Sequence, residues 1–468
     1  MKLNLYIIFL LFAHCISCKK FIAVDPPSTV IISATAFSSD ASATSAMLGI
    51  YSRMMENPEK FSGGATGISA LCGMSADELT EYSTEPSRRA FYTNTLSVTN
   101  TYIYVWWAEL YNYIYQCNAI LEGLDKSGSV TSEVKQHLRA ETAFIRSYCY
   151  FYLTNLYGEV PLILSTDYTQ NARASSASTQ DLYARMVTDL QMAKQGLGEE
   201  YIDARYGSTS DRLRPNRHTA GALLARIYLY QKAWQSALLE SDTIINSGLY
   251  VLPEDLSGVF LKNSPEAIWQ LSPVAGDFST FDGYHFILNS APSPFTSTGT
   301  VAISQELLDA FEAGDQRKSF WVGTLDADGM LFYYPAKYRQ QTAAATTVKE
   351  YQVVIRLAEI FLIRAECKAA LNDVAGAQAD LNTIRIRAGI PGTTANSTVE
   401  LENAIFQERR VELFTEYGHR WLDLKRSNRA GLLLRPIKGI GWQPTDILYP
   451  IPQSEIQNDP YLKQNEGY

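Results

Sequence analysis

The spacing of apolar residues along the chain predicts a predominantly helical protein. Between residues 40 and 55, Ala43, Met47, Ile50 and Met54 recur at intervals of three or four, which is the period of one helix face. Further stretches repeat this pattern, and several end at glycine or proline, the residues that stop helices. Helices are therefore predicted over residues 40–55, 102–124, 133–157, 179–197 and 400–427.

Two later segments resemble each other. One runs through 218–230 and then 234–248, and the other runs through 356–366 and then 374–389. Each shows a helix with small residues, a short turn and a second helix that ends at glycine. This is the layout of a tetratricopeptide repeat, whose period is about 34 residues. Small residues that would let paired helices approach closely are Ala220, Ala225, Ala365 and Ala377.

The polar and apolar pattern changes between residues 249 and 351. Prolines and short β-type runs replace the helical period, and residues 321–325 and 330–334 flank an Asp-Ala-Asp-Gly turn, which predicts a β-hairpin. Residues 56–100 show weak periodicity and are expected to form loops with little regular structure. The predicted fold class is mainly α: tetratricopeptide-like helical repeats with an irregular, partly β insertion. The predicted boundaries are a scaffold over about 36–248 and 352–430 and an insertion over about 249–351, within a single domain 18–468.

The N-terminus has the pattern of an export signal. Lys2 is followed by a mostly apolar run over residues 3–12, then a short zone with small residues that ends at Cys18. An apolar run of this length is too short to cross a bilayer comfortably. With cysteine at the cut, the pattern predicts a lipoprotein signal peptide, 1–17, and a mature chain lipidated at Cys18. The alternative is an ordinary secretory signal cut nearby. No later apolar run approaches the length of a membrane helix, so the lipid is the only visible anchor.

Composition and motifs exclude several functions. The net charge is −9 and no basic block is present, which argues against nucleic acid as a partner. The chain lacks HExxH, GxSxG and phosphate-loop motifs, and its histidines lie far apart in the sequence. Adjacent Asp77 and Glu78 are better explained as solvated loop acids than as a catalytic pair. Asp326 and Asp328 are better explained as a hairpin turn than as a calcium loop. No catalytic residue, metal site or cofactor is predicted.

The most specific pattern is the charged and apolar segment 408–426. It runs Glu-Arg-Arg-Val-Glu-Leu-Phe and then, from Gly418, Gly-His-Arg-Trp-Leu-Asp-Leu-Lys-Arg. In a continuous helix, Glu416 and Arg420 would pair at i,i+4. The segment resembles the signature of the SusD/RagB family, the lipid-anchored nutrient-binding partners of outer-membrane transporters. Further matching stretches are Cys18–Pro27, Trp107–Asn118, Arg139–Pro161, Arg364–Gly389 and Pro450–Tyr468.

The resemblance implies a helical body with four tetratricopeptide-like units, held at the cell surface on the outer membrane by its lipid. It also implies a partner, a SusC-like TonB-dependent transporter, to which the protein would hand captured glycan. Peptide capture by the same architecture is the alternative, and a surface hydrolase is a third reading that lacks a catalytic pair. The family binds ligands through loop aromatics and polar side chains, here expected within 71–106 and 269–321. The resulting candidates are Asp77, Tyr82, Tyr92, Trp106, Trp269, Tyr284, His285 and Trp321.

Overall fold

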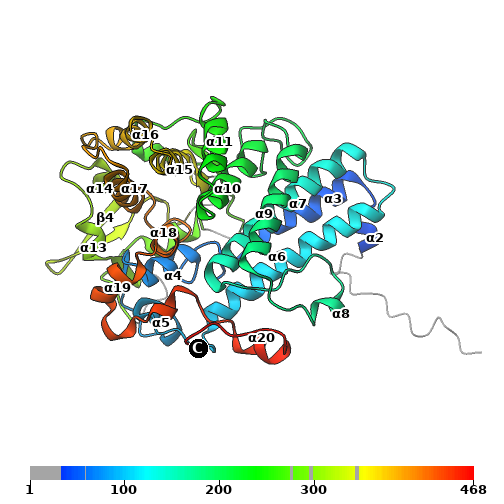
Figure 1. The fold of residues 1–468 in the computed structure, drawn as a ribbon, viewed down its shortest axis with the longest axis horizontal. Coiled ribbons are helices and arrows are strands. Elements are labelled where there is room, and N and C mark those ends of the chain that lie inside the picture. Colours follow the sequence, from blue (N-terminus) through cyan, green and yellow to red (C-terminus); the bar gives the residue numbers. More distant parts are fainter. Residues whose placement is uncertain (1–32, 58, 275–277, 295–298, 343–346) are drawn as a thin grey trace, which may run out of the picture.

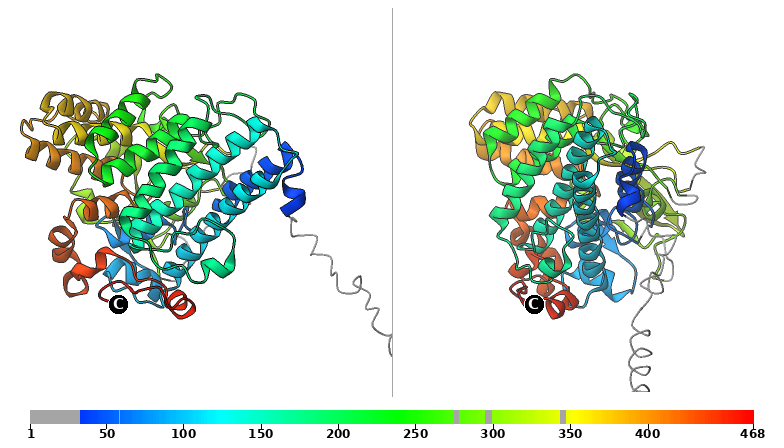
Figure 2. Two further views of the ribbon diagram at one scale, coloured as in Figure 1. Left: turned by 45° about the vertical axis from the view of Figure 1, so that its right-hand side comes forward. Right: turned by 90° about the vertical axis from the view of Figure 1, so that its right-hand side faces the viewer.

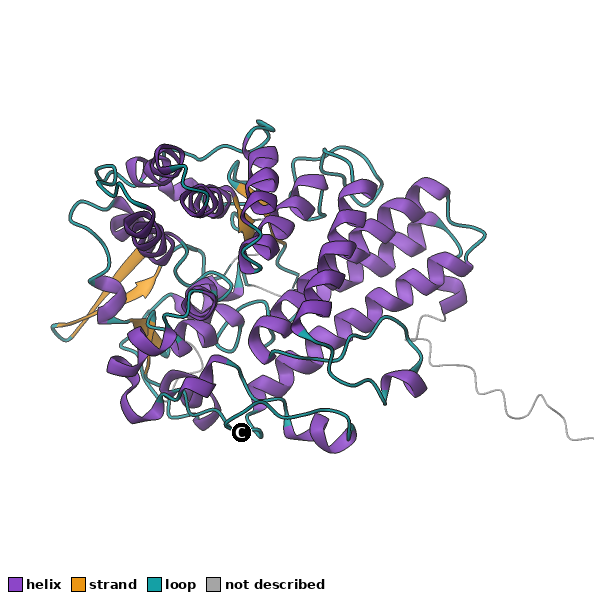
Figure 3. Ribbon diagram, viewed as in Figure 1, coloured by secondary structure: helices purple, strands orange, loops and turns teal. Residues whose placement is uncertain are grey.

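The computed structural model describes residues 33–57, 59–274, 278–294, 299–342 and 347–468, so the predicted signal peptide and Cys18 lie outside the described residues. Most of the regular structure in these ranges is helical, and the strands form short antiparallel pairs (Figure 3). The predicted mainly α fold with a partly β insertion is confirmed. The helices before the insertion are α2 (Ser33–Ala36), α3 (Asp40–Met54), α4 (Ile68–Ser75), α5 (Pro86–Thr93), α6 (Thr101–Lys126), α7 (Ser132–Tyr157), α8 (Tyr168–Asn171), α9 (Thr179–Gly196), α10 (Arg217–Tyr230) and α11 (Trp234–Ile245).

The longest helices form one side of the molecule. In Figures 1 and 2, α6 and α7 run side by side, and α3 and α9 pack against α7. In α7, every residue from Ala140 to Leu153 is buried, because neighbouring helices cover this part of the helix on several faces. The ends of these helices agree closely with the ends predicted from the spacing of apolar residues.

The two similar segments form equivalent helix pairs. Helix α10 is followed after three residues by α11, and α15 (Leu357–Ala370) is followed after three residues by α16 (Val374–Arg387). The middle residue of each turn has a left-handed backbone, with φ of 57° at Lys232 and 64° at Asn372. Helix α11 packs against α15, so the two pairs stack on each other. The predicted repeats are therefore real structural units.

The insertion carries the strands. Its β4 and β5 form a hairpin at the edge of the molecule (Figure 1), and β2 pairs with β6. Strand β3 leaves the insertion to pair with β1 (Leu79–Glu81). Elements of this part are η3 (Leu256–Gly258), β2 (Ala267–Leu271), α12 (Phe281–Phe286), β3 (Val301–Ile303), α13 (Gln305–Leu308), α14 (Gln316–Trp321), β4 (Val322–Ala327), β5 (Met330–Pro335) and β6 (Gln352–Arg356).

Two expectations need correction. Residues 56–100 have more regular structure than expected, because α4, β1 and α5 lie among their loops. All eight residues of α4 are buried, so this helix has no polar face and shows no amphipathic period. The predicted helix 400–427 is broken at 413–418, where Thr415, Tyr417 and Gly418 have positive φ. The remaining elements are α17 (Thr398–Glu412), α18 (His419–Arg426), α19 (Ala430–Lys438), η4 (Gly439–Gly441), η5 (Pro444–Ile447) and α20 (Gln453–Asn458).

The break at 413–418 changes the ion pairs of the signature segment. Glu416 does not pair with Arg420, and instead accepts hydrogen bonds from Arg356 and Lys337. Arg356 also donates to Glu412 (2.6 Å) and to Glu266 (2.7 Å) in the interior. These buried charges join β6, the start of β2 and the end of α17, so the signature segment is structural.

The described cysteines are free and buried: Cys72, Cys117, Cys149 and Cys367. Burial raises the pKa of Cys72 to about 12, which keeps the thiol protonated. Across the described ranges, we find no helix with the length and apolar character that a membrane span requires.

Candidate functional site

The two stretches expected to supply the binding surface, 71–106 and 269–321, meet in the structure. Strand β1 pairs antiparallel with β3, so that Leu79 lies opposite Ile303. The backbone N–H of Tyr82 extends this ladder by donating to the carbonyl oxygen of Thr300 (2.8 Å). The loop after β1 is therefore fixed against the insertion, although more than 200 residues separate them in sequence.

The predicted hairpin is confirmed next to this junction. Ala327 lies opposite Met330, which leaves the two-residue turn Asp328-Gly329 with φ of 54° and 83°. Positive φ at both positions is typical of the tight turn that suits the twist of a hairpin. Asp326 accepts a hydrogen bond from the N–H of Gly329 (2.9 Å), so this carboxylate closes the turn. Within the described ranges, no cluster of three or more His, Cys, Asp or Glu side chains is arranged to hold a metal ion.

One face of the hairpin carries aromatic rings. Phe332 and Tyr334 are two residues apart on β5 and share a face with Met330, whose side chain is 62% exposed. The Tyr334 ring covers Gly323 on β4, where a β-carbon would collide with it. The Tyr82 ring meets Phe332 edge-on, with centroids 6.0 Å apart. We call Tyr82, Met330, Phe332 and Tyr334 the hairpin face.

Buried polar contacts hold Tyr82 in place. Arg88, on α5, donates to Glu81 (2.8 Å) and to the hydroxyl of Thr300 (2.6 Å). The Glu81 carboxylate also accepts a hydrogen bond from the backbone N–H of Ser83 (2.6 Å), so the residues on either side of Tyr82 are bonded to each other. The Tyr82 side chain itself is half-buried, and this partial burial raises the pKa of its hydroxyl, so it stays protonated at neutral pH. The ring is therefore positioned and still partly open to solvent.

Two other predicted tyrosines, Tyr92 and Tyr284, are half-buried, and Tyr92 lies near enough to Tyr82 to help raise the pKa of the Tyr82 hydroxyl. The Tyr92 ring lies beside the ammonium of Lys438, 4.6 Å from the ring centroid, and this lysine also donates to the Tyr92 carbonyl (2.8 Å). The Tyr284 ring packs edge-on against Phe278, with centroids 4.3 Å apart. The protein thus covers part of each ring, and the rest of each side chain is exposed to solvent.

The three predicted tryptophans are core residues, which corrects their assignment as stacking platforms. All three are at most 1% exposed, and each indole N–H donates to a backbone carbonyl. The Trp269 ring is surrounded edge-on by three aromatic rings, the nearest at 4.9 Å. A ring that is enclosed in this way has no face left for a ligand. The acceptors are the carbonyls of Thr66 for Trp106, Leu213 for Trp269 and Leu256 for Trp321.

Asp77 and His285 are also interior residues. Asp77 accepts hydrogen bonds from Arg420 at 2.7 and 2.8 Å and lies 2.8 Å from Arg410. His285 is 1% exposed, and burial lowers its pKa well below the usual value, so the ring is neutral. Neither side chain reaches solvent, so neither is available to bind the hydroxyl groups of a ligand in this structure.

Sequence reasoning missed three members of the hairpin face: Met330, Phe332 and Tyr334. The alternation within the predicted hairpin was visible, and it places these residues on one face. Which face stays open depends on contacts with β3 and with Tyr82, which come from distant parts of the chain. The sequence does not show these tertiary contacts. An aromatic strand at the edge of the predicted insertion was still a signal that could have pointed to this face.

Comparison with known proteins identifies the family. A model of the SusD family matches residues 327–468, and a second, SusD-like model described as starch-binding and associating with the outer membrane matches residues 44–229. The chain belongs to the SusD family. Proteins of the SusD family are non-catalytic binding proteins, and the family description associates them with the outer membrane. The protein is therefore a binding protein and not an enzyme.

Relatives of this SusD-family chain match over nearly their whole length. SusD-like protein P25 of Formosa agariphila is 26% identical, over an alignment that covers 98% of each chain. SusD-like protein P2 of the same organism is 23% identical and covers 94% of this chain and 95% of its own length. The likeness to these two relatives therefore extends over nearly the whole of both aligned chains.

Solved structures share the fold of this SusD-family chain. A SusD superfamily protein from Bacteroides vulgatus superposes with a TM-score of 0.79 at 20% identity, covering 92% of this chain and 99% of its own. A laminarin-binding SusD-like protein gives 0.75 at 22% identity, covering 92% and 100%. Surface glycan-binding protein A from Bacteroides thetaiotaomicron gives 0.77 at 20% identity, also covering 92% and 100%. At such identities the likeness establishes the fold, which is the tetratricopeptide-like SusD fold.

Proposed function

We propose that this SusD-family protein is a lipid-anchored, cell-surface receptor that captures an oligo- or polysaccharide and delivers it to a SusC-like TonB-dependent outer-membrane transporter. Two structural relatives are described as a laminarin-binding protein and a surface glycan-binding protein, which supports a glycan as the ligand. The observation that carries the proposal for this chain is the hairpin face, because it places partly exposed tyrosines on a fixed β-framework.

The hairpin face suits a sugar ligand. The apolar faces of sugar rings stack on flat aromatic side chains, and tyrosine hydroxyls such as those of Tyr82 and Tyr334 can exchange hydrogen bonds with sugar hydroxyls. Each ring contact is expected to contribute about 0.5–1.5 kcal/mol, by analogy with other aromatic contacts. Since both rings are held by packing against Phe332 and Gly323, little side-chain entropy is lost on binding.

The test is binding of the soluble chain, starting after Cys18, to a panel of polysaccharides, oligosaccharides and peptide mixtures by affinity electrophoresis and calorimetry. With the glycan that binds, Tyr82→Ala and Tyr334→Ala are each expected to raise the Kd about 2- to 12-fold. Tyr168→Ala is the matched control, because Tyr168 is 80% exposed on α8 in a different part of the molecule. Unchanged affinity in both hairpin-face variants would rule out this surface as the site.

The same panel separates the alternatives. Binding only to peptides would favour the peptide-capturing function of the same architecture. Product formation by a pure sample would favour a hydrolase and contradict the family assignment as a binding protein.

The transporter partner is tested separately. Affinity purification of the lipidated chain from detergent-solubilised outer membranes is expected to recover a TonB-dependent β-barrel protein. Purification of the intact, membrane-bound chain without any such protein would contradict the delivery step and leave glycan capture unaffected.

A further inference from the structure

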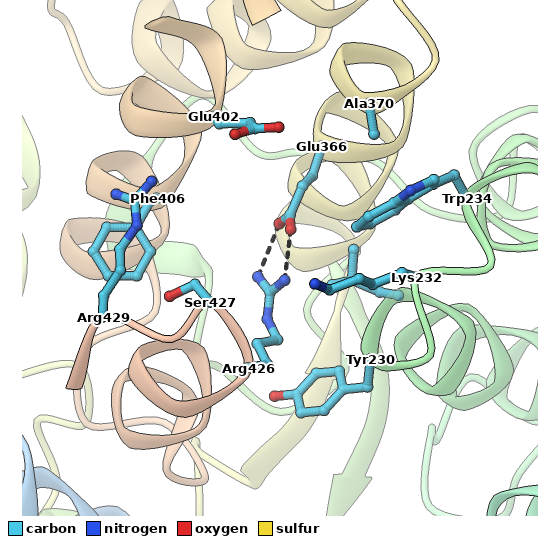
Figure 4. A pocket seen from close by; sticks show the side chains of 11 residues that line it. Tyr230, Lys232, Trp234, Glu366, Ala370, Glu402, Phe406, Arg426, Ser427 and Arg429 are labelled. Atoms are coloured by element: carbon cyan, nitrogen blue, oxygen red, sulfur yellow. Dashed lines mark hydrogen bonds and ion pairs between the residues drawn. The ribbon is translucent and has the colours of Figure 1, made fainter. Parts of the chain in front are cut away.

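A polar pocket lies between the helix pairs, away from the hairpin face. Its volume is about 180 Å³, comparable to one small ring-shaped group. Figure 4 shows walls from the α10–α11 turn, α15, α17 and the end of α18. Trp234 is half-buried at one side, and Phe406 and Arg429 stand at the other. The lining residues are Leu229, Tyr230, Lys232, Trp234, Glu366, Ala370, Glu402, Phe406, Arg426, Ser427 and Arg429.

Some charges of the pocket neutralise one another. Arg426 and Glu366 form a two-pronged ion pair at 2.5 and 2.8 Å, visible in Figure 4. Arg426 also donates to the carboxylate of Asp423 (2.7 Å), so each of its three guanidinium nitrogens donates to a carboxylate. This pair forms a fixed polar wall and attracts no further ion.

Other charges of the pocket have no ion-pair partner within the described residues. Lys232 and Glu402 are exposed and make no salt bridge there. Arg429 lies over the ring of Phe406 (4.4 Å to its centroid) and forms no ion pair with a described carboxylate. The lining residues include three cations and two carboxylates, so the pocket carries one net positive charge. A ligand with a single negative charge would balance it.

Lys232 occupies a backbone position that does not favour lysine. Its φ of 57° lies in the left-handed region, where glycine and asparagine are preferred. The equivalent turn of the second repeat has Asn372, with φ of 64°. Figure 4 shows the Lys232 side chain extending inward beneath Trp234, toward the Arg426–Glu366 pair. Replacing lysine by asparagine would thus suit the turn better and would remove the ammonium, with its aliphatic stem, from the pocket.

We infer that this pocket binds a carboxylate-bearing sugar residue, a uronic acid, as a second ligand site independent of the hairpin face. Lys232 and Arg429 attract the carboxylate, and the Trp234 indole covers the apolar side of the ring. Glu402 and the Ser427 hydroxyl, which already donates to the Asp423 carbonyl, accept hydrogen bonds from ring hydroxyls. A zwitterionic amino acid fits less well, because its zero net charge would leave the pocket positive.

The experiment titrates the soluble chain with sodium D-glucuronate by ligand-observed NMR and calorimetry. Methyl glucoside, acetate and N-acetylalanine serve as neutral, carboxylate-only and peptide-end probes. Glucuronate is expected to bind more tightly than all three. Lys232→Asn and Arg429→Gln are each expected to raise the Kd about tenfold or more, since each removes a charge-assisted hydrogen bond.

Two controls separate loss of the site from loss of the fold. Lys232→Asn should unfold at the same temperature as the wild type or higher, because asparagine suits the left-handed turn. Lys126→Asn removes an exposed lysine at the end of α6 with the same change in net charge, and should leave the Kd unchanged. Tyr82→Ala should also leave glucuronate binding unchanged, so failure of the hairpin-face proposal does not affect this test. No binding of glucuronate, tighter binding of N-acetylalanine, or unchanged affinity in both pocket variants would overturn the inference.

Discussion

Adjacent residues in this chain acquire opposite electrostatic behaviour from their surroundings. Burial alone would raise the pKa of Asp77, but ion pairs with Arg420 and Arg410 outweigh it and lower the pKa. Glu78, the next residue, is buried, and its carboxylate accepts a long hydrogen bond from the N–H of Thr415 (3.3 Å). Burial, reinforced by the charge of Asp77, raises the pKa of Glu78 to about 8. Two acids that look like a catalytic pair in sequence are thus two different structural groups.

Glu78 is expected to make stability depend on pH. Its folded-state pKa of about 8 exceeds the ordinary value of 4.5, so its contribution is fully present below pH 4.5 and is lost as pH rises through 8. Glu78→Gln keeps an acceptor for Thr415 and removes the titration. The variant should match the wild type near pH 4.5 and unfold at higher urea concentration at pH 8–9. Urea midpoints measured from pH 4.5 to 9 check this, and equal pH slopes for the two proteins would contradict it.

At the scale of elements, the sequence predicted those helices whose apolar faces repeat with a helical period, and missed those that do not. The turns at Lys232 and Asn372, and the hairpin around Asp328, could be predicted because nearby residues alone are enough to specify them. Helix α4 was missed because it is buried on all sides, and the break before α18 depends on positive φ at Thr415 and Tyr417. For the site, Tyr82 was predicted, whereas its contact with Phe332 required the pairing of β1 with β3. The burial of the tryptophans depends on packing against other distant segments of the chain.

The hairpin turn links local backbone geometry to the hairpin face. Gly329 has φ of 83°, and alanine there would cost about 1–2 kcal/mol because its β-carbon disfavours left-handed backbone. Gly329→Ala should therefore speed hydrogen exchange in residues 322–335 and weaken binding of the glycan identified by the panel. Asp328→Asn is the control, since asparagine tolerates φ of 54°. If Gly329→Ala accelerated exchange but left the affinity intact, ligand binding would not need an ordered hairpin.

At the scale of the whole molecule, buried charges fix the insertion to the helical scaffold. Arg356, at the end of β6, contacts Glu266 before β2 and Glu412 at the end of α17. Arg387 on α16 adds a second bridge to Glu266 (2.6 Å). Removing one member of such a network leaves an unpaired buried charge, so the network holds together only as a unit. The hairpin face is thus presented by a rigid body, which lowers the entropy lost on ligand capture.

Attachment of this rigid body to the membrane is expected to depend on one residue outside the described ranges. The lipid expected on Cys18 would supply the anchor. In the native host, the wild type should incorporate labelled palmitate and sediment with outer membranes, whereas Cys18→Ala should do neither. Cys15→Ala is the matched control, because position 15 belongs to the segment that is predicted to be cut away and should be dispensable for lipid attachment. Labelling that persists in Cys18→Ala would place the anchor elsewhere. A Cys18→Ala protein that sediments without label would show that protein contacts, and not the lipid, hold the receptor at the surface.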